Sequence, residues 1–335
     1  MSCRPVRSTI AAVLVVVSGA SCTIQRWQPA KVASTDDHTA HMSATDMSMR
    51  TPVPRSGGDV QGRSGLPASA ATAAARLAES PRHAEWVKLA WEPGSRDSLM
   101  AWIVYPETEA KAPVVVVIHE IFGLSTWVRA VADQLAADGF VAIAPDLNSR
   151  VRGGPSTTEL SGDSARKLIS GVGYAERNRG IVAAASYAMA QPSAERIYAV
   201  VGYCWGGSTA FSHAVYNGHG LRAAVAFYGL PYMNGAIPIA DSLARIQVPT
   251  MLLSGSLDAR IGASMPAVDS TMKALKKDYF GKNYEGAVHG FLRAQDDGPA
   301  PGQQANPATQ AANLAATKDA WPRTVAFLKR HLRPE

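Results

Sequence analysis

The feature that most constrains the fold is a run of five β-branched residues from Val114 to Ile118. A run with no polar face fits a strand that is covered on both sides, as in a parallel sheet between two layers of helices. We expect further strands at residues 140–144, 197–201, 223–228 and 250–253, and a short one near Tyr284.

Segments with helical spacing separate these runs. Apolar residues recur from Trp127 to Leu135, after a Ser125 or Thr126 that can cap the helix. Further helices are expected at residues 162–190, after Gly207, at 265–277 and at the chain end, where Pro322 fits only the first turn. Strands that alternate with helices predict an α/β fold, with a mostly parallel sheet flanked by helices on both faces. Paired edge strands at residues 86–91 and 99–105 precede it.

The N-terminal residues predict export. Arg4 and Arg7 precede an apolar run at residues 10–17, and small residues lead to Cys22. This pattern is typical of a signal peptide, here residues 1–21, since the run is too short to span about 30 Å of hydrocarbon. Cys22 resembles the lipid-attachment site of a bacterial lipoprotein; the alternative is a spare thiol beside an ordinary cleavage site. We expect a location in the periplasm or cell envelope, with lipid on Cys22 as the only membrane contact.

Residues 22–80 are rich in Ala, Ser, Thr, Gly and Pro and lack apolar periodicity. This composition predicts a flexible tether, so we place the folded domain at residues 81–335. The tether contains side chains that suit copper, namely His38, His41, Met42, Met47 and Met49. We favour a polar linker over a metal site there.

The formal net charge of +6 does not indicate a nucleic-acid-binding protein. Residues 1–80 and 81–335 carry the same small excess of basic residues, and neither contains a basic run with interleaved aromatic residues. A clustered basic surface is the usual footprint of nucleic-acid binding. We therefore expect no nucleic acid partner.

The segment from Gly202 to Gly207, Gly-Tyr-Cys-Trp-Gly-Gly, carries the strongest chemical signal. It follows an expected strand and opens an expected helix, which is the setting of a nucleophile elbow with Cys in place of Ser. The helix N-terminus favours the thiolate form of Cys204. Apart from Cys3 and Cys22, Cys204 is the one cysteine of the chain, and an unpaired thiol in an exported domain indicates reactivity. The alternative is a buried cysteine in a glycine-rich turn.

A thiol nucleophile needs a base, and the chain supplies one in the order that α/β-hydrolases follow: nucleophile, acid, base. Asp258 follows the strand at residues 250–253, and His289 follows the short strand near Tyr284. We expect His289 to accept the thiol proton and Asp258 to hold the imidazole tautomer. Rival acids are Asp241, Asp269 and Asp278.

Together, five segments resemble the dienelactone hydrolase (carboxymethylenebutenolidase) family over about residues 84–333. They are His119 to Leu124, Pro145 to Leu147, Gly202 to Gly207, and the loops of Asp258 and His289. The resemblance implies an α/β-hydrolase fold and the hydrolysis of an ester or lactone.

The resemblance also implies roles for five other residues. Glu120 would contact the resting thiol and move away when substrate binds. The backbone N–H groups of Ile121 and Trp205 match the family's oxyanion hole, which agrees with the general geometry of such sites. Arg150 and Arg293 match arginines that bind a substrate carboxylate, a task that suits a guanidinium. The alternative is that both are ordinary surface arginines.

We therefore expect a monomeric cysteine hydrolase that cleaves a small carboxylate-bearing ester or lactone through an acyl-enzyme, with no metal or organic cofactor. One rival is a thioesterase or peptidase that uses the same site. Another is a non-catalytic envelope protein that binds a ligand, or a metal through the tail. The stretch Ala294–Lys318 looks longer and looser than the family's link to its last helix, which leaves the substrate open.

Overall fold

The computed structural model describes residues 65–333, with gaps at 92–93, 95, 157–161, 232–239, 299–303 and 305. All of these residues belong to one compact unit, residues 58–335. The expected signal peptide, Cys22 and the His- and Met-containing segment lie outside the described residues.

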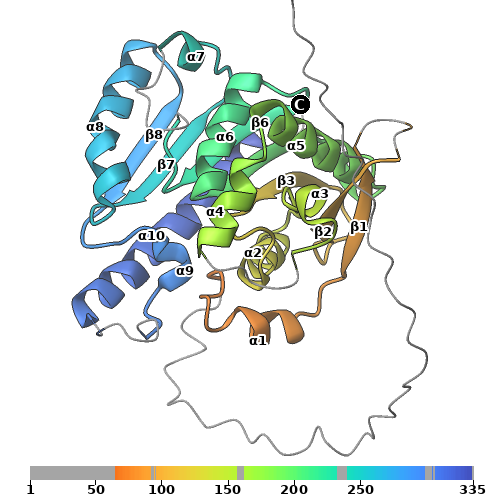
Figure 1. Cartoon of the computed structure of the whole chain (residues 1–335), viewed down its shortest axis with the longest axis horizontal. Helices are drawn as coiled ribbons and strands as arrows, with labels where there is room; N and C mark the ends of the chain where they lie inside the picture. The colour runs from red at the N-terminus through yellow and green to blue at the C-terminus, as the bar shows by residue number, and fades with distance from the viewer. Residues whose placement is uncertain are drawn as a thin grey trace, which may run out of the picture. The chain divides into compact units, whose positions relative to one another are not determined.

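The described chain forms one sheet from β1 (Ala84–Ala90), β2 (Ser98–Val104), β3 (Ala112–Ile118), β4 (Val141–Pro145), β5 (Ala194–Tyr203), β6 (Leu221–Phe227), β7 (Thr250–Gly255) and β8 (Tyr279–Tyr284). Their order is β1-β2-β4-β3-β5-β6-β7-β8 (Figure 1). β2 pairs antiparallel with β1 and β4, and the other neighbours are parallel. The predicted mostly parallel sheet is confirmed. The carboxyl ends of β3 and β5 to β8 therefore meet at one edge, where ligands bind in such sheets.

Helices cover both faces of the sheet. They are α1 (Ala73–Ala78), α2 (Thr126–Ala137), α3 (Ser149–Arg152), α4 (Gly162–Ser170), α5 (Tyr174–Met189), α6 (Trp205–Tyr216), α7 (Ala240–Ala244), α8 (Ala259–Ala274), α9 (Phe291–Ala294) and α10 (Pro307–His331). Val115 and Val117 of β3 pack in the core under α2 and α10, whereas Val114 and Val116 pack in the core under α5, α6 and α8. The apolar run is thus buried on both faces, as predicted. None of the helices described here is long and apolar enough to cross a membrane.

The expected helix at residues 162–190 is two helices, α4 and α5. Gly171 and Gly173 lie in the break between them. Glycine is a poor helix former because it loses the most backbone freedom on folding, so a pair of glycines favours an interruption.

The last helix is longer than expected, because α10 begins at Pro307. The side chain of Asn306 caps it by accepting a hydrogen bond from Thr309 N–H at 3.2 Å, and proline suits the first helical position. The placement of Pro322 in the first turn is therefore wrong, since it lies inside α10. The expectation of a loose stretch at Ala294–Lys318 is also wrong for its second half, which is helical.

The prediction that the tether extends to residue 80 is wrong for the part that the structure describes. Residues 66–69 are buried, and Ala73 of α1 belongs to the core that α2 and α10 cover. The indole N–H of Trp127, on α2, donates a hydrogen bond to Ala68 O at 3.0 Å. Small residues such as Ala and Ser show no apolar periodicity, yet they can be buried wherever a neighbouring surface covers them. The folded domain therefore includes residues from Gly65 onward.

Candidate active site

Cys204 lies on the sharp turn between β5 and α6. Its backbone has φ 57° and ψ −116°, a conformation that residues other than glycine rarely adopt. Space requires the neighbouring glycines: a Cβ on Gly202 would lie 1.9 Å from Gly206 O, and one on Gly206 would lie 2.3 Å from Ile118 O. The strained turn presents the thiol at the carboxyl edge of the sheet, as a nucleophile elbow does.

Three side chains from separate loops meet at this turn. The Nδ1–H of His289 donates a hydrogen bond to Oδ2 of Asp258, and the imidazole interacts with the side chain of Cys204. Asp258 is fixed in turn, because its Oδ1 accepts a hydrogen bond from Ile261 N–H at 3.2 Å at the start of α8. The structure thus brings Cys204, His289 and Asp258 together. The rival Asp269 instead accepts a hydrogen bond from a tyrosine of β8.

The protonation of this group follows from its contacts. Burial by itself lowers the pKa of His289, but the hydrogen bonds and charges of Asp258 and Cys204 outweigh it and raise the pKa to about 10. Burial raises the pKa of Asp258, but the hydrogen bond and charge of His289 bring it below the ordinary value of a carboxyl. The geometry therefore favours an imidazolium beside a carboxylate.

Glu120 follows β3 and is buried, with 5% of its surface exposed. Its Oε2 lies 3.7 Å from Nη1 of Arg293, and among the described residues it has no hydrogen-bond partner. Burial raises the pKa of Glu120, against the charges of Arg293 and His289. Glu120 therefore lies near both the guanidinium of Arg293 and the imidazole of His289, where a buried carboxyl can respond to a bound substrate.

Two tyrosines that sequence reasoning missed also line this region. The hydroxyls of Tyr203 and Tyr228 are buried and have no hydrogen-bond partner among the described residues. The Tyr228 ring centroid lies 5.0 Å from that of His289. Burial and then the charge of Glu120 raise both tyrosine pKa values well above the ordinary one. Tyr228 directly follows β6, so its place at the carboxyl edge of the sheet was the available signal.

The expected oxyanion-hole donors are the backbone N–H groups of Trp205, which directly follows Cys204, and of Ile121, which follows β3. Trp205 opens α6, where the first backbone N–H groups have no partner within the helix. His119 fixes the peptide that carries the N–H of Ile121: its Nε2 accepts from Leu147 N–H at 3.0 Å, which leaves Nδ1–H to donate to Glu120 O at 2.6 Å. In a trans peptide the C=O and N–H point in opposite directions, so holding Glu120 O also aims the N–H of Ile121.

Arg150 does not join this group. Its guanidinium pairs with Glu176 at 2.5 Å and Asp97 at 3.0 Å, and it stacks 4.0 Å above the ring of Trp91. It lines a cavity of about 600 Å³ whose lining includes neither Cys204 nor its two partners. In this structure Arg150 therefore has local partners of its own, and its expected role in binding a substrate carboxylate stays a prediction.

The chain resembles known proteins over most of its length. Residues 99–332 match the dienelactone hydrolase family. A provisionally named carboxymethylenebutenolidase of Escherichia coli O157:H7 is 27% identical over 80% of this chain and 96% of its own, and the carboxymethylenebutenolidase of Pseudomonas putida is 29% identical over 58% and 82%. A dienelactone hydrolase-like promiscuous phosphotriesterase from metagenomic libraries has a solved structure with a TM-score of 0.56 and 27% identity, over 72% of this chain and 98% of that one.

Proposed function

Because this chain belongs to the dienelactone hydrolase family and is a hydrolase acting on ester or lactone bonds, we propose that Cys204 is its nucleophile, with His289 and Asp258 as base and orienting acid. The observation that carries the proposal is the hydrogen bond from His289 to Asp258, with the imidazole next to the side chain of Cys204 on its strained elbow. The residue types, their order and their contacts fit the roles that such triads require.

In the proposed reaction, His289 holds the proton of the Cys204 thiol as an imidazolium, and the thiolate attacks the carbonyl carbon. The N–H groups of Ile121 and Trp205 stabilise the oxyanion. The tetrahedral intermediate collapses with cleavage of the C–O bond, and the imidazolium of His289 protonates the leaving alkoxide. Water, deprotonated by His289, then attacks the thioester. Cleavage of the C–S bond releases the carboxylic acid, which ionises to the carboxylate product, and restores the Cys204 thiolate beside the imidazolium of His289.

The proposed substrate is a small ester or lactone that bears a carboxylate. Arg293 supports this choice, because its guanidinium lies beside the buried Glu120 and its Nε is buried without a hydrogen-bond partner among the described residues. A substrate carboxylate could satisfy that donor with a charge-assisted hydrogen bond. The anion would also compete with Glu120 for the same cation.

The test is a screen of small lactones and aryl esters with the wild type, Cys204→Ala and Cys204→Ser. We expect the alanine variant to lose at least about a thousandfold in kcat, as nucleophile removal does in related triads. Iodoacetamide should inactivate the wild type in step with modification of Cys204, and mass spectrometry after rapid quenching should detect a thioester on this residue. Full modification with unchanged turnover would exclude the mechanism.

We also propose that the protein is exported as a monomer, with residues 1–21 removed and lipid on Cys22. The support is the order of basic, apolar and small residues before Cys22. The intact mass of protein purified from a bacterial host, with a Cys22→Ala variant beside it, checks both points. A mature chain that begins at Cys22 but carries no added lipid mass would support export and exclude the lipid anchor. Gel filtration tests whether the protein is a monomer.

A further inference from the structure

The segment Gly65–Ser80, which we call the strap, lies against α2 and against the loop that follows His289. Residues 66–69 are buried, although the strap precedes the first strand and is remote in sequence from the catalytic loops. Figure 1 shows it as the orange segment that ends in α1, below α2. Its contacts with the loop after His289 are the starting point of the inference.

Four hydrogen bonds join the strap to residues 293–297. Ala70 N–H donates to Arg293 O at 2.8 Å, and the side-chain amide of Gln295 donates to Pro67 O at 2.9 Å. Two more bonds end on Asp297: the Ser69 hydroxyl donates to its Oδ1 at 2.6 Å, and Ala71 N–H donates to its Oδ2 at 2.9 Å. The partners are more than 220 residues apart in sequence, so the strap supports this loop through long-range tertiary contacts.

The loop needs such support. α9 has four residues, too few to be stable alone, because helix nucleation is unfavourable. It ends at Gln295, whose φ of 45° and ψ of −129° are strained for a residue other than glycine. Gln295 is buried, and its side-chain amide reaches both Pro67 O and, at 3.2 Å, Leu292 O. The strap therefore supplies a partner that holds the strained end of α9.

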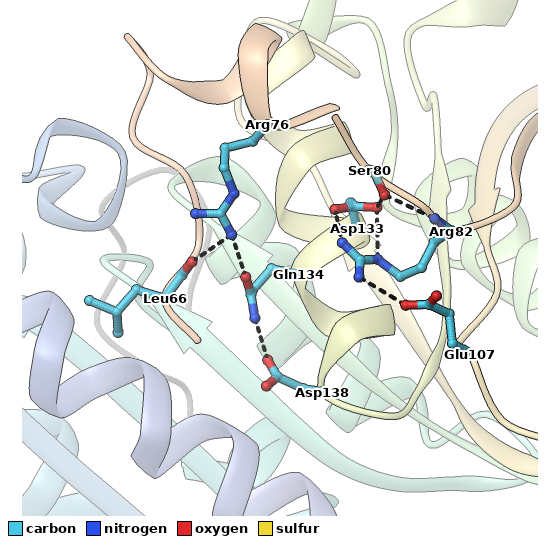
Figure 2. A network of polar contacts seen from close by, with 8 residues as sticks. All are labelled: Leu66, Arg76, Ser80, Arg82, Glu107, Asp133, Gln134 and Asp138. Carbon is cyan, nitrogen blue, oxygen red and sulfur yellow. Dashed lines mark hydrogen bonds and ion pairs between the residues drawn. The ribbon is translucent and has the colours of Figure 1, made fainter. Parts of the chain in front are cut away.

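The strap is itself anchored to α2, as Figure 2 shows. Arg76 Nη2 donates to Leu66 O at 3.3 Å and to Oε1 of Gln134 at 2.9 Å, and the Gln134 amide continues to Asp138. At the other end of the strap, Ser80 donates to buried Asp133 at 2.5 Å.

Arg82, just beyond the strap, binds the same carboxylate of Asp133 through two nitrogens, at 3.0 and 2.7 Å. α2 is a core helix, so these bonds give the strap a rigid base. The strap can therefore transmit the position of α2 to the end of α9.

We propose that the strap is a positioning element of the active site, which sets the place of Arg293 through Gln295 and Ser69 and thereby the affinity for an anionic substrate. The inference deepens the proposed function and rests on it for the substrate class. Arg293 is held from two sides: its backbone carbonyl accepts from Ala70, and its side chain lies 3.7 Å from Glu120. A shift of the end of α9 moves the guanidinium, while Cys204 and Asp258 stay on β5, α6 and α8.

The test compares Gln295→Met with Gln191→Met in the full chain. Both changes keep the side-chain length and remove side-chain to backbone hydrogen bonds; Gln191 donates to Tyr187 O at 3.0 Å on α5, away from the loop. We expect Gln295→Met to raise KM for a carboxylate-bearing ester about tenfold, with kcat and the KM for a neutral ester within twofold of wild type. Gln191→Met should change neither. An equal rise in KM for both esters, or an unchanged KM for the anionic one, overturns the proposal.

Ser69→Ala provides a second variant, since it removes one bond to Asp297 and leaves Gln295 in place. We expect the same split with a smaller rise in KM. Hydrogen exchange gives a readout that needs no substrate: amides of residues 290–297 should exchange faster in Gln295→Met and in Ser69→Ala, and at the wild-type rate in Gln191→Met. If no ester is hydrolysed, the proposed function fails, and exchange still decides the inference. Faster exchange confined to this loop supports it, and unchanged or uniformly faster exchange refutes it.

Discussion

Arg150 and Arg293 both follow the carboxyl end of a parallel strand, β4 and β8, but their side chains meet different surroundings. Arg150 pairs with two carboxylates and lies over the face of Trp91. Arg293 has one carboxylate, Glu120, at 3.7 Å, and its Nε has no hydrogen-bond partner among the described residues. The guanidinium of Arg150 is occupied by local partners, whereas that of Arg293 has an unpaired donor near Glu120.

The difference shows that sequence position does not decide whether an arginine is available to a ligand. A substrate carboxylate at Arg150 would have to displace two ion pairs and a stacked ring, whereas at Arg293 it would fill an empty donor. Arg293 also lies on α9, whose end is fixed by the strap. We therefore propose that substrate recognition lies on the Arg293 side of the sheet edge, and that the group around Arg150 is structural.

Among the variants considered, Asp258→Asn should have the largest effect on kcat. Such a loss would show that the reaction depends on the group of side chains near Arg293 and not on the group near Arg150. An amide can neither accept the Nδ1 proton as strongly nor stabilise the imidazolium, so the orientation and charge of His289 are lost. By analogy with other triads, we expect kcat to fall about 10³- to 10⁴-fold. The measurement is kcat for a neutral ester, which avoids any contribution from Arg293. A loss below tenfold would mean that another acid serves His289.

Arg293→Ala should have the next largest effect, and it tests the comparison directly. Loss of a charge-assisted hydrogen bond costs about 1.5–3 kcal/mol, which is about 10- to 150-fold at about 1.4 kcal/mol per tenfold. We expect kcat/KM for an anionic lactone to fall by this factor, and that for an aryl acetate to change little. Arg293→Lys, which keeps the charge without the planar fork, should recover part of the loss. An equal fall for both substrates would instead indicate damage to the triad.

The Arg293 side should also respond to pH through His289. A pKa raised from 6.5 to about 10 in the folded state stabilises the protein fully below about pH 6.5, and this stabilisation is lost as the pH rises through about 10. Asp258→Asn removes the main group that raises the pKa. The difference in unfolding free energy between wild type and variant should therefore be largest near pH 6 and shrink above pH 10. Urea unfolding of both proteins at the two pH values measures this difference. A difference in unfolding free energy that does not change with pH would contradict the prediction.

The sequence was sufficient where local pattern decides the structure. The β-branched run of β3 predicts burial on both faces, and Val114 and Val115 do pack in opposite cores. The elbow predicts a strained Cys204, because glycines at fixed positions flank it and the approach of strand to helix leaves no room for a Cβ.

The sequence was insufficient where a partner lies far along the chain. Pro67 and Ala68 are covered by α2 and by the loop after His289, and the composition of the segment gives no sign of this burial. Likewise, Arg150 finds Glu176 on α5 and Asp97 before β2, and both partners depend on the finished sheet. The packing of the strap and the ion pairs of Arg150 depend on tertiary contacts, whereas a strand and a nucleophile elbow depend largely on local sequence.

Arg150→Ala should have the smallest effect and is the sharpest control on the comparison. Its two ion pairs are partly exposed, so each stabilises the fold by about 0–1 kcal/mol, and its stacking on Trp91 adds about 0.5–1 kcal/mol. We expect a loss of about 0.5–2 kcal/mol in unfolding free energy.

The ratio of kcat/KM for the anionic lactone to that for the aryl acetate should stay within twofold of wild type in Arg150→Ala. Arg166→Ala, which breaks an exposed pair with Asp163 on α4, is the matched control and should leave both stability and ratio unchanged. A tenfold fall in the ratio for Arg150→Ala, with none for Arg293→Ala, would reverse the two roles. It would also mean that Arg150 leaves Glu176 and Asp97 when substrate binds, because both ion pairs occupy its guanidinium in this structure.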